Sequence, residues 1–398
     1  MIEFILRYDM VQTLGTGTVA KSYTALERVG HGLTRPVTLK QLEGEDVSPD
    51  RLATLRELSL VHHSGLRLPR GLVVNSGGVA VICDYLVGRS LVGLVAQCIR
   101  QRRPLSEQAA THLFARAAES IADLHEGWLG SPRAHGAIRP SNLLFSDLGE
   151  LWIDDAGLAA DPCELARRGT LSLEHARYAS PEALATAAGG AESLNRKEAH
   201  GNDVYGLAAC LYTLATLRRP FDEMDLNTLL TRKTEAPVSA RRINPRVSRE
   251  LAALLMSVLS PSGPRQKARG LARALRALAP PNPPPSVELR ALIDSESLVQ
   301  HQQLLKRCHS DPAVELHTED VPTDMNVRDS MERLPDEDEE LATDIESPQG
   351  LSTDDSLETD PMGTVVAAAE DIFDISEHSG LEHSSPDPTR TRTRTRTK

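Results

Sequence analysis

The sequence is poor in cysteine, and its cysteines are not placed to form a structural site. The five among 398 residues are scattered, and none belongs to a Cys-x-x-Cys pair: Cys83, Cys98, Cys163, Cys210 and Cys308. This odd, dispersed set argues against a disulfide framework and against a zinc site built from thiolates. We therefore expect a protein of the reducing cytoplasm.

Long apolar runs are missing as well. No stretch approaches the roughly 20 apolar residues of a membrane-spanning helix, and the apolar run around Val79–Val87 is interrupted by Cys83, Asp84 and Tyr85. The first residues, MIEFILRYDM, lack the basic segment and long apolar core of a signal peptide. We expect a soluble protein without a membrane span, in which residues 79–87 form a buried strand.

Aromatic side chains are scarce, at 3% of the residues, and basic side chains are scarce in the last part of the chain. Residues 281–398 contain 27 Asp and Glu against 10 Lys and Arg, whereas residues 1–280 contain 29 against 34. A body of net charge +5 is thus joined to a segment of net charge −17. Because the body is only slightly basic and the acidic segment would repel phosphate, we expect no nucleic-acid partner.

What is present begins with a small, mainly β unit. In residues 8–42 short β-type runs alternate with turn residues, and from Pro49 to His62 leucines recur on one helical face. Two further apolar runs, Gly71–Val74 and Val79–Leu86, flank a turn of Asn, Ser and Gly, which predicts a hairpin. Residues 8–86 therefore predict a sheet accompanied by one helix.

After Gly88 the pattern becomes helical. Ser106 can cap a helix with one apolar face, and later helices are predicted over Asp203–Leu217, Ser248–Leu259 and Ala268–Leu278. The proline-rich run from Pro280 to Pro285 cannot continue a helix, so it ends the domain.

The last part of the chain divides into two predicted segments. Residues 281–310 are a Pro-rich linker followed by one more helix, over 286–309, docked on the domain. Residues 311–398 are acidic, rich in Ser and Thr and poor in aromatics, so they cannot bury enough apolar surface to offset the entropy of ordering. We expect a disordered tail that ends in alternating Thr and Arg and contains one apolar segment, Val365–Ile375, able to fold against a partner.

Several motifs mean little alone but come in an informative order. An imperfect glycine-rich loop over residues 14–20 could be a simple hairpin turn. It is followed by His-Gly-Ala-Ile-Arg-Pro-Ser-Asn over residues 135–142, Asp-Asp-Ala-Gly over 154–157, Ser-Pro-Glu over 180–182 and Asp-Val-Tyr-Gly over 203–206. Over roughly residues 8–280 this sequence resembles the Ser/Thr protein kinase family, in particular its eukaryotic-like bacterial members. The resemblance implies an α+β, two-lobe kinase fold with a β-rich N-lobe over residues 8–86 and a helical C-lobe over 87–280.

The resemblance also implies a site for ATP. Gly15 and Gly17 would let the backbone approach the phosphates closely. Lys40 would neutralise the charge of the α- and β-phosphates, and Glu57, on the single N-lobe helix, would hold Lys40 in position. Taken alone, Lys40 could be any strand lysine and Glu57 a solvated helix residue.

Magnesium and adenine have implied partners too. Asn142 and Asp155 match the two residues of the family that hold Mg²⁺, a hard cation that prefers oxygen ligands. Cys83 falls at the gatekeeper position, and the backbone from Asp84 to Leu86 falls at the hinge that would meet adenine. A structural ion pair is implied outside the site, between Glu182 and Arg265 of the C-lobe.

The catalytic loop departs from the family at the residue that matters most for transfer. Ala137 stands where the family has the aspartate that orients a substrate hydroxyl and accepts its proton. Gly136 replaces the arginine before it, Arg139 replaces the lysine that steadies the γ-phosphate, and His175 replaces a threonine of the activation segment. Two smaller departures are Ala20, at the third loop glycine, and Ala156, after the metal-binding aspartate.

Neither nearby acid is expected to substitute for the missing aspartate. Asp154 precedes Asp155 on what should be an extended strand, so its side chain is expected to project to the opposite side. Asp147 lies in the following turn, on the wrong side of Asn142. Losing a general base typically costs about 10²–10⁴ in rate.

Two functions follow from this pattern. The first is a pseudokinase, a kinase fold that binds ATP and Mg²⁺ and acts as a scaffold or allosteric partner of other signalling proteins. The alternative is a weakly active Ser/Thr protein kinase that transfers the ATP γ-phosphate to protein hydroxyls by positioning and charge stabilisation alone.

The tail suggests a third role, which does not exclude the other two. Four of its threonines precede an aspartate: Thr323, Thr343, Thr353 and Thr359. An active partner kinase could phosphorylate them, and a phosphothreonine-binding module could then recognise them. A solvated tail without such a role explains the same composition.

Overall fold

A computed structural model describes residues 7–17, 19–30, 33–42, 47–75, 78–127, 131–261, 265–279, 286–293 and 295–309. The proline-rich run from Pro280 to Pro285 and the tail threonines lie outside these residues, as does the apolar segment Val365–Ile375. The predictions made for them therefore stay predictions.

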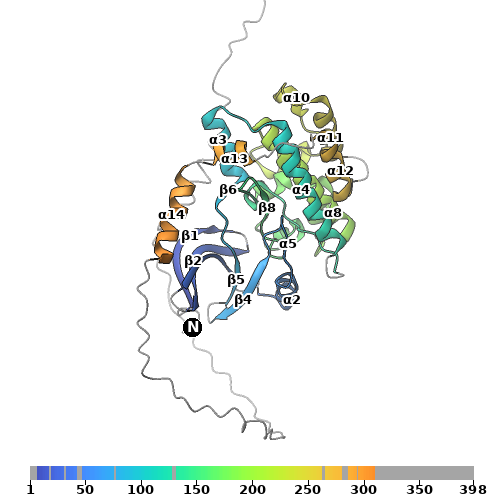
Figure 1. Ribbon diagram of the computed structural model, residues 1–398. Coiled ribbons are helices and arrows are strands. Elements are labelled where there is room, and N and C mark those ends of the chain that lie inside the picture. The colour runs from blue at the N-terminus through green and yellow to red at the C-terminus, as the bar shows by residue number, and fades with distance from the viewer. Residues whose placement is uncertain are drawn as a thin grey trace, which may run out of the picture.

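The N-terminal part is a five-stranded antiparallel sheet accompanied by helix α2, and both the sheet and this helix are predicted by the sequence (Figure 1). The strands lie in the order β1-β2-β3-β5-β4. The elements are β1 (Tyr8–Thr16), β2 (Ala20–Gly30), β3 (Leu33–Leu42), α2 (Pro49–Leu58), β4 (Pro69–Asn75) and β5 (Gly78–Asp84). The predicted hairpin is β4 and β5, and it places the end of β5 beside β3.

The following part is mainly helical, with a small three-stranded sheet in the order β6-β7-β8 at its junction with the first. The short elements of that junction are β6 (Gly88–Ser90), η2 (Pro140–Asn142), β7 (Leu143–Ser146) and β8 (Leu151–Ile153). The helices are α3 (Leu91–Gln101), α4 (Glu107–Glu126), α5 (Pro162–Arg167), α6 (Leu173–Tyr178), α7 (Pro181–Ala188), α8 (Arg196–Thr216), α9 (Leu226–Arg232), α10 (Ala240–Ile243), α11 (Arg249–Leu259) and α12 (Ala268–Leu278).

Helix starts follow the capping signals in the sequence. The side chains of Ser106 and Ser248 accept hydrogen bonds from the backbone N–H groups of Ala109 and Leu251, which satisfies donors that the first helical turn leaves unpaired. These caps fix where α4 and α11 begin, and both helices start where the sequence predicts.

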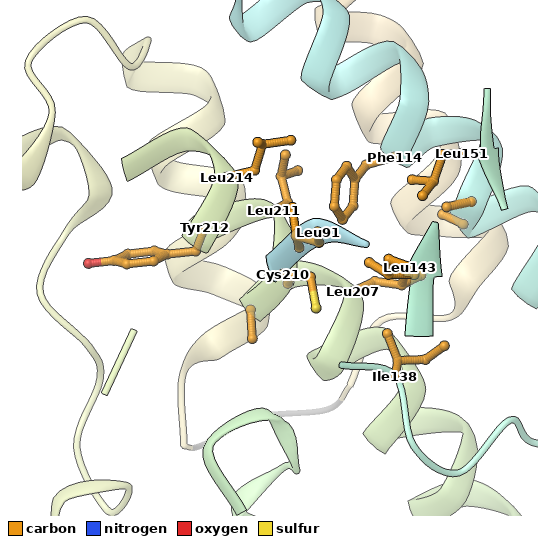
Figure 2. Close-up of a cluster of buried hydrophobic side chains, with 14 of the residues drawn as sticks. Leu91, Phe114, Ile138, Leu143, Leu151, Leu207, Cys210, Leu211, Tyr212 and Leu214 are labelled. Atoms are coloured by element: carbon orange, nitrogen blue, oxygen red, sulfur yellow. The ribbon is translucent and has the colours of Figure 1, made fainter. Parts of the chain in front are cut away.

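The main core gathers around α8, which is buried along most of its length. Figure 2 shows Leu207, Cys210 and Leu211 of this helix facing Leu91, Phe114 and Leu143 from α3, α4 and β7. Ile138, from the loop that carries Ala137, joins the same cluster. The packing therefore ties this loop to the most buried helix of the molecule.

The segment after Pro285 differs from the single helix predicted for it. It forms two helices, α13 (Ser286–Leu292) and α14 (Ser295–His309), which dock as predicted but on different parts of the molecule. Helix α13 lies against α3, whereas α14 lies against β3 and β6 (Figure 1). One straight helix cannot follow both surfaces, so the chain changes direction between them.

In the part of the chain that the structure describes, no helix is both long and apolar enough to cross a membrane.

Candidate functional site

A small cavity lies between the glycine-rich hairpin and the loop around Ala137. Its volume is about 50 Å³. The residues that line it are Gly17, Val19, Ala20, Ser22, Ala137, Arg139, Asn142, Asp155, Leu158, Ala159, Ala160 and His175. The fold thus gathers most of the residues expected to handle phosphate and metal, although they are far apart in the sequence.

The glycine-rich hairpin borders the cavity through Gly17. Gly15 lies in β1 with a φ of 153°, and the N–H of Gly17 donates to the carbonyl of Ala20 at 2.8 Å, which closes the hairpin. A Cβ at Gly17 would lie 3.2 Å from that carbonyl oxygen, so the turn leaves little room for a side chain.

Lys40 lies beside the cavity, in β3, with only 3% of its side chain exposed. Its Nζ donates to Oδ1 of Asp154 at 2.6 Å and also contacts Oδ1 of Asp155. Burial alone would lower the pKa of Lys40, but these two carboxylates outweigh it and raise the pKa above its usual range. Lys40 therefore remains an ammonium group.

The expectation that Asp154 projects away from Asp155 is wrong. Strand β8 ends at Ile153, and Asp155 adopts a left-handed backbone conformation with φ at +67°. The alternation of side chains along an extended strand therefore stops before Asp155, and both carboxylates turn toward Lys40. Both oxygens of Asp154 are engaged, because Oδ1 also accepts the Asp155 N–H and Oδ2 accepts Arg67 Nη1 at 2.9 Å.

Arg67 was not singled out from the sequence, yet it is central to this group. It is buried just before β4, and its Nε donates to the backbone carbonyl of Asp84 at 2.8 Å. Burial alone would raise the pKa of Asp154, but the charges of Arg67 and Lys40 outweigh it and hold the pKa below its usual range. The available signal was a charged residue flanked by Leu66 and Leu68, since a buried charge requires a partner.

The expected ion pair between Lys40 and Glu57 does not form in the described part of the chain. Glu57 is 47% exposed and pairs with Arg133. The face of α2 turned toward the Asp-x-Gly segment carries Leu58, Thr54 and Leu55 instead, whose side chains would lie 2.6, 3.2 and 3.5 Å from a Cβ at Gly157. Thr54 is one turn before the buried Leu58, a helical spacing that could have indicated this face.

The two predicted metal ligands, Asn142 and Asp155, line the same cavity. Asn142 is buried and oriented by its neighbours, because its Nδ2 donates to the carbonyl of Ala137 at 3.0 Å. An amide oxygen and a carboxylate are suitable donors for Mg²⁺, which typically takes one or two protein ligands together with phosphate and water. Within the described residues no cluster of three or more His, Cys, Asp or Glu offers a different metal site.

Two other residues that depart from the family pattern, Arg139 and His175, line the cavity together with Ala137. Arg139 Nη1 contacts Nε2 of His175 at 2.8 Å, and Nδ1 of His175 lies 2.6 Å from Ser172 Oγ. Burial, and to a lesser extent the charge of Arg139, lower the pKa of His175 from 6.5 to about 4. The imidazole is therefore neutral at pH 7.

Asp203 of α8 anchors the backbone of the loop that carries Ala137. Its carboxylate accepts the backbone N–H groups of His135 and Gly136 at 2.7 and 2.8 Å. Gly136 has a φ of +88°, a conformation that glycine adopts without strain. The loop is thus rigidly anchored although it lacks the expected aspartate at position 137.

The predicted hinge follows β5. Cys83 is buried at the end of the strand, and burial raises the pKa of its thiol to about 11. Asp84 turns its side chain outward to Arg70, while its backbone carbonyl accepts Arg67. Leu86 is half-buried.

Comparison with known proteins agrees with this architecture. A model of the protein kinase domain matches residues 8–273, which is more than half of the chain. The chain belongs to the protein kinase domain family. In agreement with the family resemblance, the kinase domain also contains the predicted ion pair between Glu182 and Arg265, at 2.7 Å.

Similar proteins are Ser/Thr kinases of plants and bacteria. The kinase domain is similar to CBL-interacting protein kinase 4 of Oryza sativa, with 26% identity over 55% of this chain and 46% of that protein. It is also similar to serine/threonine-protein kinase PrkC of Bacillus subtilis, with 25% identity over 63% of this chain and 37% of that protein. The matches span about half or less of each relative.

Proposed function

We propose that this kinase domain binds ATP with Mg²⁺ and acts on other signalling proteins by binding them, without transferring phosphate to them. The observation that carries the proposal is the cavity wall at Ala137, where a methyl group replaces the carboxylate that the family resemblance implies. A methyl group can neither orient a hydroxyl nor accept its proton.

The polar groups beside Ala137 do not supply a replacement. Arg139 can only donate hydrogen bonds, so Nε2 of His175 is the acceptor in their contact. Nδ1 of the neutral ring then carries the proton and donates to Ser172 Oγ. Both ring nitrogens are engaged, and neither is left to take a proton from a substrate.

Binding of ATP is supported by Lys40, Arg139, Asn142 and Asp155. Asn142 and Asp155 would hold Mg²⁺, while Lys40 and Arg139 would offset phosphate charge. Ligand sites are commonly about 300–1,000 Å³, so a cavity of about 50 Å³, which the hinge residues do not line, encloses only part of such a site. Mg²⁺ would compete with Lys40 for the Asp155 carboxylate.

The proposal is tested by measuring binding and transfer on the same preparation of the full chain. We expect calorimetry to detect ATP binding that requires Mg²⁺, and labelled ATP to give no incorporation into Ser/Thr peptides above that of Lys40→Ala and Asp155→Ala proteins. Incorporation that these two variants abolish would contradict the proposal. If neither ATP binding nor incorporation is detected, the kinase fold would act only through contacts of its surface with other proteins.

A weakly active Ser/Thr kinase is the second candidate. It is favoured by the presence of Lys40, Asn142 and Asp155 in or beside one cavity, because phosphoryl transfer depends mainly on positioning and charge stabilisation. The variant-sensitive incorporation described above is the result that would establish it.

We also propose that partners engage the acidic tail. Thr323, Thr343, Thr353 and Thr359 each precede an aspartate and would carry phosphate added by an active kinase. Phosphosite mapping on protein from cells tests this, and unmodified threonines would exclude it.

A further inference from the structure

The acidic residues that contact Lys40 do not come from helix α2, from which the family resemblance implies its partner. Of the two acids on helix α2, Glu57 pairs with Arg133, and the exposed Asp50 lines a separate cleft beside α5. The acids that contact Lys40, Asp154 and Asp155, both follow strand β8. The position of Lys40 therefore does not depend on an ion pair with α2.

We infer that Asp154, anchored by Arg67, is the positioning residue of Lys40 and replaces the helix-borne glutamate in this chain. The inference rests on the proposed binding of ATP for its functional consequence, but not for its geometry. It assigns Asp154 and Arg67 to the support of the site.

Arg67 holds the carboxylate of Asp154 in a fixed position. Arg67 bridges the Asp154 carboxylate, at 2.9 Å, and the carbonyl of Asp84, at 2.8 Å, and is itself 7% exposed. A buried ion pair is retained only when its donors and acceptors are satisfied, because removing one partner leaves an uncompensated charge. The chain thus links the hinge backbone to Lys40 through two side chains.

Asp154 and Asp155 then have separate tasks. Asp155 lines the cavity with Asn142 and would hold Mg²⁺, so the metal would compete with Lys40 for the Asp155 carboxylate. Asp154 does not line that cavity and keeps its contact with Lys40. Without Asp154, Lys40 would remain paired with Asp155 and compete with the metal.

The geometry is tested on the full chain without nucleotide. The chain has seven lysines, so ¹⁵N-lysine labelling gives a simple side-chain NMR spectrum in which Lys40 is assigned with Lys40→Arg. We expect a slowly exchanging ammonium signal for Lys40, because the group is enclosed and hydrogen-bonded. Glu57→Gln should leave the exchange rate of this signal unchanged, whereas Asp154→Asn should raise it, because one of the two carboxylates that contact Lys40 loses its charge.

Each outcome of this experiment decides the inference. An unchanged exchange rate in Asp154→Asn, or a faster one in Glu57→Gln, would overturn it. The backbone amide spectrum of the same samples reports folding. Should Asp154→Asn not fold, Arg67→Lys serves instead, because lysine keeps the charge but cannot span both the Asp84 carbonyl and Asp154; a faster-exchanging Lys40 signal is then expected, and an unchanged one would count against the anchor.

The functional consequence is tested by a double-mutant cycle with MgATP, followed by amide shifts so that weak binding is still measured. Asp154→Asn should weaken binding on the order of tenfold, as expected for one charge-assisted hydrogen bond. In a Lys40→Met background the same change should have less than about a twofold effect, because Asp154 acts through Lys40. Equal losses in both backgrounds would reduce Asp154 to a structural residue. Wild-type protein that does not bind MgATP would instead refute the proposed function, and the lysine spectrum would still decide the geometry.

Discussion

His175 has a position that would suit proton transfer, but the contacts of its ring do not. It lines the cavity together with Ala137, yet its ring is fixed between Arg139 and Ser172. A histidine that always accepts from an arginine is unsuited to proton transfer, because protonating it would place two positive groups in contact. The residue is therefore better understood as part of the support of the loop than as a base.

This role predicts how stability depends on pH. The pKa of His175 is about 4 in the folded protein and near 6.5 when unfolded, so between these values the unfolded chain binds more protons. Stability should therefore fall as the pH decreases from 6.5 toward 4, and the contribution of His175 should level off below 4. Each such proton corresponds to a slope of at most about 1.4 kcal/mol per pH unit.

His175→Gln should remove that part of the slope, which urea unfolding at several pH values would measure. His200 offers a comparison outside the cavity, because burial and the neighbouring His125 also lower its pKa to about 4. We expect His200→Gln to flatten the profile similarly. A His175→Gln profile parallel to that of the wild type would show that His175 is free to take up a proton.

At the scale of elements, helices α13 and α14 join the two lobes outside the hinge. Glu288 of α13 accepts the N–H of Ser106 at 3.0 Å, so this segment adds a cap to α4. On α14, His301 stacks on Tyr85 of the hinge with ring centroids 5.7 Å apart. Thr34 of β3 donates to the carbonyl of Cys308 at 3.1 Å, which ties α14 to the N-lobe.

Because of this docking, the stability of the kinase domain should depend on residues beyond its proline-rich boundary. Leu289 of α13 is completely buried, so Leu289→Ala should lower the free energy of unfolding by roughly 2–5 kcal/mol. Val287 of the same helix is 70% exposed, and Val287→Ala should change it by less than about 0.5 kcal/mol. Urea unfolding of the full chain measures both, and equal effects would mean that α13 does not pack on α3.

Local signals in the sequence were sufficient for some elements, but they placed the start of α8 at Asp203 instead of Arg196 and gave no prediction for α3, α5, α6, α7, α9 or α10. Serines at helix starts and apolar spacing gave the positions of α4, α11 and α12 closely, because capping and amphipathic faces are short-range properties. The break between α13 and α14 was missed, since it is imposed by two docking surfaces that come much earlier in the chain.

The site was less predictable for the same reason. The direction in which the Asp154 side chain points depends on the left-handed backbone conformation of Asp155. The residues around Asp155 do not indicate that conformation. The contact of Arg67 with Asp154 joins positions 87 residues apart in the sequence, so only the fold brings the two charges together. Glu57 was chosen by residue type, whereas the helical face decides which side chain of α2 turns to the site.

On the scale of the whole molecule, charge is divided between the body and the tail. Residues 310–398 contain 24 Asp and Glu against 7 Lys and Arg, whereas residues 1–309 contain 32 against 37. The two parts therefore have net charges of −17 and +5. A tethered negative segment lowers the local concentration of other anions near the body, and salt screens this effect over about 10 Å at 0.1 M.

MgATP is itself an anion, so removing residues 310–398 should strengthen its binding by roughly two- to tenfold at low salt. The gain should shrink toward nothing above about 0.3 M salt, because the screening length then falls to a few ångströms. Calorimetric titration of the full chain and the shortened chain over a series of salt concentrations measures the difference. If the shortened chain binds MgATP more tightly by the same factor at every salt concentration, the tail acts by occupying the site through specific contacts. If the full chain binds MgATP more tightly, the tail contributes to the site.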